Sequence, residues 1–282
     1  AQMSHELRTP LNAILGYAQI LQRRPLDAGV IDNLRTVQKS GEHLLTLISD
    51  ILDIAKIEVG RMELHPAPIR FPTFIDHIAS IIRSRAEAKD LVFCLERLTA
   101  LPAGVQADET RLRQVLLNLL DNAVKFTDEG QVALRVKCED VKPGNATFTH
   151  HVSRFTFEVK DTGIGIPANQ LERIFQPFEQ VRDVTRPIKG TGLGLAISHQ
   201  LVRLMGGELQ VESEVGRGST FWFEVALPVT EVAAEVAPPP EQVITGYKGP
   251  RRTVLVVDDI PSNRAVLVGL LEPLGFDVVE AA

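Results

Sequence analysis

The chain has 282 residues, 44% of them hydrophobic and 23% charged, which is the composition of a globular protein and a length suited to about two domains. Lys and Arg number 30 against 36 Asp and Glu, and this net charge of −6 argues against nucleic acid as the main partner. Two cysteines exclude a disulfide framework, and no apolar run approaches the roughly 20 residues that cross a bilayer.

Residues 1–63 predict two amphipathic helices joined by a short loop, in which Pro25 and Gly29 break the pattern. In the first helix, the apolar residues share one stripe from Leu7 to Leu21. The second runs from about residue 31 to residue 57, and its apolar positions alternate by three and four as in a heptad seam: Leu34, Val37, Gly41, Leu44, Ile48, Ile51 and Ala55. One hairpin cannot bury both seams, so we expect a homodimer that closes a four-helix bundle.

Residues 64–229 predict an α+β domain, in which helices cover one sheet. We expect helices over about residues 74–88, 108–126 and 190–205. We expect strands over about residues 91–95, 131–137, 154–160, 208–212 and 220–227. Gly206-Gly207 and residues 216–218 supply the turns.

Residues 230–250 are rich in Ala, Glu, Val and Pro, and we expect a linker there. Residues 251–282 begin like a parallel α/β domain but hold only one βαβ unit, which is too short to bury a core of its own. We therefore expect the chain to be a piece of a longer protein. Cys94 and Cys138 suit a reducing compartment, so we expect this piece in the cytoplasm, with any membrane anchor in regions upstream of it.

His5 is the first candidate for chemistry. It lies two positions before Leu7, about 200° round a helix, and so points away from the apolar stripe. Pro10 cannot donate to the carbonyl of Glu6, which loosens the helix beside His5. An exposed imidazole next to a carboxylate suits a nucleophile that a second domain must reach. A lone exposed histidine is more often an ordinary surface residue, and the spacing alone does not overturn that alternative.

The helix over residues 108–126 carries a polar row opposite its apolar side: Arg111, Gln114, Asn118, Asn122 and Lys125. Asn is a poor residue for the middle of a helix, yet two Asn lie one turn apart with a Lys one turn later. Two amide oxygens and an ammonium in a line can hold a hydrated cation and a polyphosphate together. A solvated helix face is the alternative.

Two glycine runs and the segment between them complete the candidates. Asp161-Thr-Gly163-Ile-Gly165 follows a strand, and its glycines let the backbone approach a planar ligand while Asp161 can accept from an exocyclic amine. Residues 190–195 open a helix whose free N–H groups can cradle phosphates. Between the runs, Phe175 and Phe178 precede basic residues, which predicts a lid that packs at one end and reaches phosphate at the other. Tight turns and an exposed loop are the alternatives.

Five motifs occur in one order: His5-Glu-Leu-Arg-Thr-Pro10, Asn118-Leu-Leu-Asp-Asn122-Ala-Val-Lys125-Phe126, Asp161-Thr-Gly163-Ile-Gly165, Phe175-Gln-Pro-Phe178 and Gly190-Thr-Gly192-Leu-Gly194-Leu. In this order the chain closely resembles the bacterial sensor histidine kinases over about residues 1–228. The resemblance implies a dimerisation and phosphotransfer hairpin followed by an ATP-binding domain of the gyrase, chaperone and kinase type. Asp258-Asp259 after a strand resembles the start of a receiver domain, as in a hybrid kinase.

The resemblance implies a role for each motif. His5 would accept the γ-phosphoryl group of ATP, Glu6 would fix the imidazole tautomer, and Thr9 would position water for phosphatase action on a phosphorylated partner. Asn118 and Asn122 would hold Mg²⁺. The residues implied around the nucleotide are Asn118, Asn122, Lys125, Phe126, Asp161, Gly163, Gly165, Ile166, Lys189, Gly190, Thr191, Gly192, Leu193 and Gly194.

The resemblance also implies partners and a moving joint. The phosphoryl group would pass to the aspartate of a receiver domain. The helix hairpin and the linker over about residues 59–66 would be the moving joint that lets the ATP-binding domain swing to His5. Two alternatives stay open: a nucleotide-binding dimeric scaffold without phosphotransfer, and an ATP-driven clamp that hydrolyses ATP on water.

Overall fold

The computed structural model describes residues 14–16, 18, 21, 28–140, 152–179, 192–230, 249–258 and 261–281. The chain divides into two compact units, one of Asp53–Ala234 and one of Ala1–Leu52 with Glu235–Ala282. Helix α2 (Ala28–Glu58) crosses this division, because its last turns belong to the first of these units.

The unit of residues 53–234 is built on a seven-stranded mixed sheet. The strands follow the order β1 (Ala67–Arg70), β3 (Gly104–Ala107), β7 (Gly218–Thr230), β5 (Val152–Asp161), β4 (Gln131–Asp140) and β2 (Val92–Arg97), with β6 (Leu209–Glu214) also pairing with β7. The pair β2–β4 is parallel and the other pairs are antiparallel. The predicted α+β class is confirmed.

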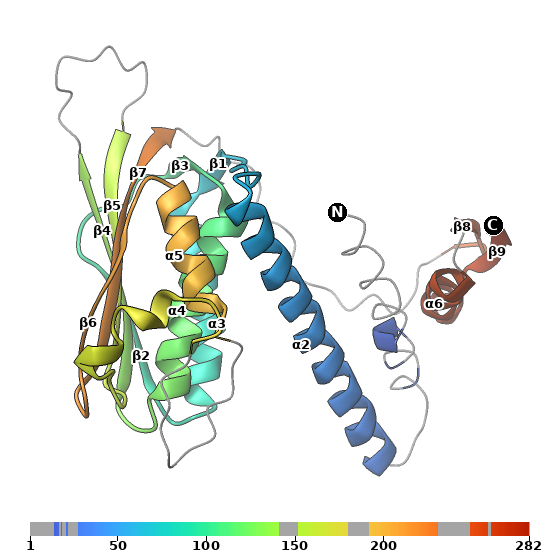
Figure 1. Ribbon diagram of the computed structural model, residues 1–282. Helices are drawn as coiled ribbons and strands as arrows, with labels where there is room; N and C mark the ends of the chain where they lie inside the picture. The colour runs from blue at the N-terminus through green and yellow to red at the C-terminus, as the bar shows by residue number, and fades with distance from the viewer. Residues whose placement is uncertain are drawn as a thin grey trace. The chain divides into compact units, whose positions relative to one another are not determined.

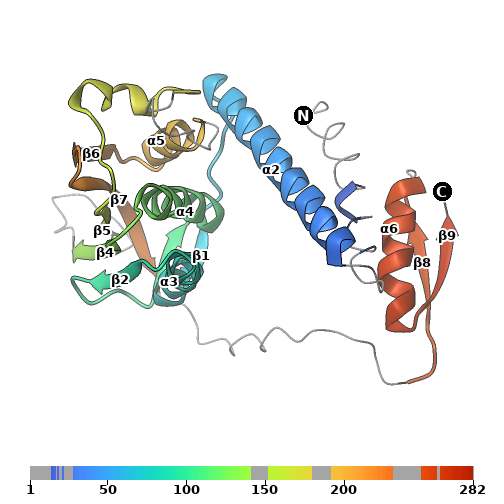
Figure 2. The same cartoon turned by 90° about the horizontal axis from the view of Figure 1, so that it is seen from below.

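Three helices cover one face of the sheet: α3 (Phe71–Glu87), α4 (Glu109–Phe126) and α5 (Gly194–Leu204), as Figures 1 and 2 show. Their apolar sides meet a layer of phenylalanines from the sheet. Phe71 meets Phe155 edge to face, with 4.8 Å between ring centroids, and Phe157 stacks on Phe223 at 4.9 Å. All four rings are fully or almost fully buried, so the core lies between this face and the helices.

Helix α4 forms as the sequence predicts. Asp108 is its N-cap, since its side chain accepts from the backbone N–H of Arg111 at 3.1 Å. The predicted apolar residues are all buried: Leu112, Val115, Leu116, Leu119, Leu120 and Ala123. Burial of this stripe fixes the rotation of α4, and therefore the direction in which its polar row faces.

Several predicted boundaries were wrong for local reasons. Helix α3 begins at Phe71 rather than near residue 74, because Pro72 fits the first turn, where its missing N–H has no partner to lose. Helix α2 begins at Ala28, so Gly29 lies in its first turn instead of in the loop. The sequence did not predict β1 and β3, which are only four residues each.

Helix α2 carries an apolar stripe that is exposed to solvent in the single chain. Val30, Val37, Leu44 and Ile51 recur every seven residues and are 42–50% exposed. Of the predicted first helix, residues 14–16, 18 and 21 are described, and they are helical. The sequence prediction of a heptad seam in the second helix agrees with this stripe.

The end of the chain folds as one βαβ unit, as predicted. Strands β8 (Thr253–Val257) and β9 (Asp277–Ala281) pair in parallel. Helix α6 (Pro261–Leu271) and a short 3-10 turn, η3 (Glu272–Leu274), connect them. Of the predicted linker, residues 231–248 lie outside the described residues.

Candidate functional site

The polar row of α4 divides into an N-terminal part and a C-terminal part. Asn118, Asn122 and Lys125 occupy the middle and the C-terminal end, where the two amides are half-buried. The ammonium of Lys125 lies 4.5 Å from the centroid of the Phe126 ring, and burial lowers the pKa of Lys125. Two amides and one cation therefore face the same side of the helix, as the spacing predicts.

Asn118 is held in a fixed orientation by α5. Its Nδ2 donates to Oγ of Ser198 at 2.8 Å, and its Oδ1 lies against Gly194. A Cβ at Gly194 would come within 2.2 Å of that oxygen, so only glycine permits this approach. Ser198 was not predicted from the sequence. The signal available there was a serine among the apolar residues of this helix, and the structure shows that it is 1% exposed.

Asp161 ends β5 and is 6% exposed. Its Oδ1 accepts from the backbone N–H groups of Gly163 at 2.8 Å and Ser219 at 3.2 Å. Burial raises the pKa of Asp161, and the two N–H donors partly oppose this shift. Within the described part of the chain both bonds go to Oδ1, so Oδ2 is available to accept from a ligand.

The loop after Asp161 joins the C-terminal end of α4 to the turn between β6 and β7. The N–H of Ile164 donates to the carbonyl of Phe126 at 3.2 Å, and the N–H of Gly216 donates to the carbonyl of Ile164 at 2.8 Å. Gly165 has φ +69°, and a Cβ there would lie 2.1 Å from the carbonyl of Glu214. Backbone packing alone therefore explains this glycine, and the predicted role beside a ligand ring stays a prediction.

The first part of the predicted lid, which contains Phe175 and Phe178, is anchored in the structure. Phe175, in the short 3-10 helix η2 (Arg173–Phe175), stacks on the His199 ring of α5, with 4.9 Å between centroids. The N–H of Phe178 donates to the carbonyl of Gly192 at 3.0 Å, which brings together the residues on either side of the segment 180–191. Leu193 is fully buried next to this contact, whereas Phe178 is 68% exposed.

Several predicted site residues lie outside the described residues: His5, Glu6, Thr9, Lys189, Gly190 and Thr191. Within the described ranges, no group of three His, Cys, Asp or Glu side chains could bind a metal ion. The assignment of Asn118 and Asn122 as metal ligands stays a prediction from the sequence. No helix in the described part of the chain is long and apolar enough to cross a membrane.

Two family models match the chain. Residues 1–60 match the His Kinase A (phospho-acceptor) domain. Residues 107–229 match the histidine kinase-, DNA gyrase B-, and HSP90-like ATPase.

Curated relatives match almost the whole chain. The aerobic respiration control sensor protein ArcB of Escherichia coli is 40% identical over 278 residues, which is 98% of this chain and 34% of ArcB. The sensor histidine kinase AruS of Pseudomonas aeruginosa is 39% identical over all 282 residues, which is 27% of AruS. The chain therefore spans only about a third of the length of these relatives.

Among solved structures, full-length ShkA in complex with AMPPNP is similar to this chain, with a TM-score of 0.66 and 33% identity. The match covers 100% of this chain and 55% of ShkA. Acinetobacter baumannii histidine kinase AdeS shares the fold at a TM-score of 0.51 and 22% identity, over 79% of this chain and 97% of AdeS.

Proposed function

The chain contains the catalytic core of a sensor histidine kinase, and we propose that it transfers the γ-phosphoryl group of ATP to His5 and then to the aspartate of a receiver domain. One observation carries the proposal: the loop that begins at Asp161 is hydrogen-bonded to the C-terminal end of α4 through Ile164 and Phe126. A candidate base-binding carboxylate therefore lies beside the helix that holds the candidate phosphate and metal ligands.

Asp161 would recognise the adenine amine. Its Oδ1 is committed to two backbone donors, which fixes the carboxylate and leaves Oδ2 to accept from the exocyclic N–H. Lys125 would neutralise phosphate charge from the last turn of α4, beside the Phe126 ring. Lys189, at the end of the predicted lid, and Gly190 and Thr191, at the start of the second glycine motif, would contact the phosphates.

Asn118 and Asn122 fit Mg²⁺ by the chemistry of their donors. Magnesium prefers oxygen ligands and keeps several waters, so two neutral amides together with phosphate oxygens are a suitable set. The hydrogen bond from Asn118 to Ser198 limits the rotation of that amide before any ligand binds. The ion would supply charge neutralisation at the phosphates.

In the transfer step, the ring nitrogen of His5 without a proton bonds to the γ-phosphorus while the bond from that phosphorus to the leaving ADP oxygen breaks. Glu6 would accept from the opposite ring N–H and so hold the required tautomer. Loose phosphoryl transfer needs little covalent assistance, so positioning and charge neutralisation supply most of the rate.

The homodimer is part of the same proposal. Val30, Val37, Leu44 and Ile51 are an exposed heptad stripe on α2, and the match of residues 1–60 to the phospho-acceptor domain supports its burial against a second copy. The AruS match includes the βαβ unit at the end of the chain, which supports a receiver domain fused in the longer protein.

The decisive experiment incubates the chain with γ-labelled ATP and Mg²⁺, followed by acid and base treatment. We expect label that is stable in base, labile in acid and absent from His5→Gln. His77→Gln is the matched control, because His77 is an exposed histidine on α3 and should leave labelling unchanged.

Other results would contradict the proposal. Label that persists in His5→Gln refutes the phosphoacceptor. ATP binding without label indicates the scaffold, and sustained ATP turnover without phosphoprotein indicates the clamp. Mixing His5→Gln with Asn122→Ala then tests the direction of transfer, since label in the mixture requires transfer between subunits.

A further inference from the structure

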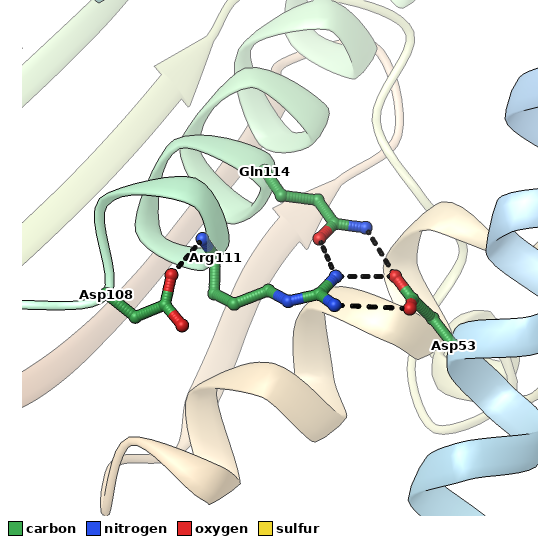
Figure 3. A network of polar contacts seen from close by, with 4 residues as sticks. All are labelled: Asp53, Asp108, Arg111 and Gln114. Atoms are coloured by element: carbon green, nitrogen blue, oxygen red, sulfur yellow. Dashed lines mark hydrogen bonds and ion pairs between the residues drawn. The ribbon is translucent and has the colours of Figure 1, made fainter. Parts of the chain in front are cut away.

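The last turns of α2 are attached to the start of α4 by a partly buried ion pair (Figure 3). Asp53 of α2 is 8% exposed, and its carboxylate accepts from both terminal nitrogens of Arg111, at 2.6 and 3.3 Å. Gln114 connects to both partners: its Oε1 accepts from Arg111 at 2.8 Å and its Nε2 donates to Asp53 at 3.4 Å. This bidentate contact fixes geometry as well as charge.

The segment that follows α2 is also attached to α4. The N–H groups of Gly60 and Arg61 close the end of the helix on the carbonyls of Ile57 and Lys56, and Met62 is buried. The N–H of His65 donates to Oδ2 of Asp108 at 3.0 Å. Asp108 is the N-cap of α4, so the same turn that holds Asp53 also holds His65.

These contacts bear on where the domain can pivot. Residues 53–66 are fixed to α4 near both of their ends, and the boundary between the two compact units falls inside α2, just before Asp53. From the sequence we expect the moving joint in the helix hairpin and in the linker over about residues 59–66, and these contacts bear on the linker part of that expectation. A segment that is bonded to the first turns of α4 near both of its ends cannot act as a hinge between α4 and the end of α2.

We propose that Asp53 is a positioning residue for phosphoryl transfer, acting through Arg111 and Gln114. It makes the end of α2 and the nucleotide-binding helix α4 one rigid piece, so that the domain reorients by bending of α2 upstream of Asp53. The inference rests on the proposed kinase function and adds a residue that touches neither nucleotide nor phosphoacceptor.

The chain offers a matched control on the same helix. Arg113 forms an ion pair with Glu109 at 2.5 Å, but the side chains of this pair are 29% and 48% exposed and both lie on α4. Arg113 reaches α3 through the Phe74 ring, at 5.0 Å from its centroid, but its ion pair with Glu109 stays within one helix. A partly exposed pair of this kind is of little energetic value. Glu109→Gln should therefore leave every readout below unchanged.

The experiment measures Mg²⁺·ATP affinity and the autophosphorylation rate at saturating ATP in the full chain. We expect Asp53→Asn to slow the rate at least about tenfold, because misplacement by about 1 Å can cost two orders of magnitude, while the dissociation constant of ATP changes less than about twofold. Asp53→Glu keeps the charge and should recover part of the rate. Arg111→Lys should be intermediate, since it keeps the charge but loses the bidentate fork.

Two outcomes overturn the proposal. Asp53→Asn with the wild-type rate means that the contact does not position anything, and a parallel loss of rate and ATP affinity means that Asp53 only supports the domain fold. Wild-type chain that binds ATP without taking up label instead refutes the kinase function. In that case, hydrogen exchange at the His65 amide tests whether Asp53 attaches the end of α2 to α4. Faster exchange in Asp53→Asn supports this attachment, and unchanged exchange refutes it.

Discussion

Asp161→Asn is the substitution that best separates binding from folding at the candidate site. The amide oxygen of Asn can take the place of Oδ1 and accept from Gly163 and Ser219, so the loop should keep its conformation. The amide nitrogen then takes the place of Oδ2. A donor would face the donor amine of adenine where the wild type offers an acceptor.

The structure gives the size of the effect. A hydrogen bond to a charged group contributes about 1.5–3 kcal/mol, so its loss should weaken ATP binding by about 10- to 150-fold. Guanine presents a carbonyl where adenine presents its amine, so the affinity for GTP should fall little or rise in the variant. We expect the preference of the chain for ATP over GTP to narrow in Asp161→Asn.

Asp161→Asn should bind ATP more weakly than the wild type, but its folded state should be no less stable. Burial raises the pKa of Asp161 above its ordinary 3.8, so the contribution of this group to stability is complete below that pH and is lost as the pH rises through the folded pKa. At neutral pH the buried carboxylate is therefore a cost that Asn does not have. The melting temperature of Asp161→Asn should equal or exceed that of the wild type.

Calorimetric titration with ATP and GTP, at neutral pH and at successively more acidic pH, tests both parts. Wild-type affinity for ATP should decline as Asp161 takes up its proton, and Asp161→Asn should decline less over the same steps, because the titration of ATP itself is common to both proteins. Unchanged ATP affinity in the variant would refute the assignment of Asp161 to the base. Weak binding with a melting temperature several degrees lower would refute the separation, because the loop itself would have changed.

Three further substitutions test the site and the core. Gly165→Ala should destabilise the fold in thermal melts by more than the about 1–2 kcal/mol that a left-handed backbone conformation costs, because the added Cβ meets the Glu214 carbonyl. Gly206→Ala is its control: Gly206 has φ +82° and nothing within 4 Å of the added Cβ, so this variant should show the backbone strain alone. Ser198→Ala should weaken Mg²⁺·ATP binding but leave ATP binding in EDTA unchanged, because it frees the Asn118 amide. Phe157→Ala should lower the free energy of unfolding in urea by about 3–5 kcal/mol, whereas Phe178→Ala, at an exposed position, should change it by less than about 0.5 kcal/mol.

The sequence was informative where one element is governed by its own periodicity. The apolar stripe of α4 and the seven-residue repeat of α2 follow from residue spacing, and both appear in the structure. Strands β1 and β3 could not be found this way, since four residues hold too few alternations to detect. Pro68 in β1 argues further against a strand, although an edge strand tolerates it.

The candidate site shows the same difference between residues that local sequence reveals and residues that packing reveals. Asn118, Asn122 and Asp161 stand out in motifs, because their residue types are unusual for a helix interior or a strand end. Ser198 is 80 positions from Asn118 in the chain, and the contact depends on how α5 packs against α4. Only the three-dimensional arrangement reveals such a partner.

The sequence does not show that the polar row of α4 has two separate roles, and the structure does. All five of its residues lie on one side of the helix, yet Arg111 and Gln114 bind Asp53 while Asn118, Asn122 and Lys125 remain for the ligand. Arg111 and Lys125 are separated by about 21 Å along the helix axis at 1.5 Å per residue. A tilt of only 5° about the N-terminal contact would then move the phosphate end by about 2 Å, more than a near-attack geometry tolerates. Fixing α4 at the end remote from the phosphates is therefore an effective way to control where the γ-phosphoryl group is presented.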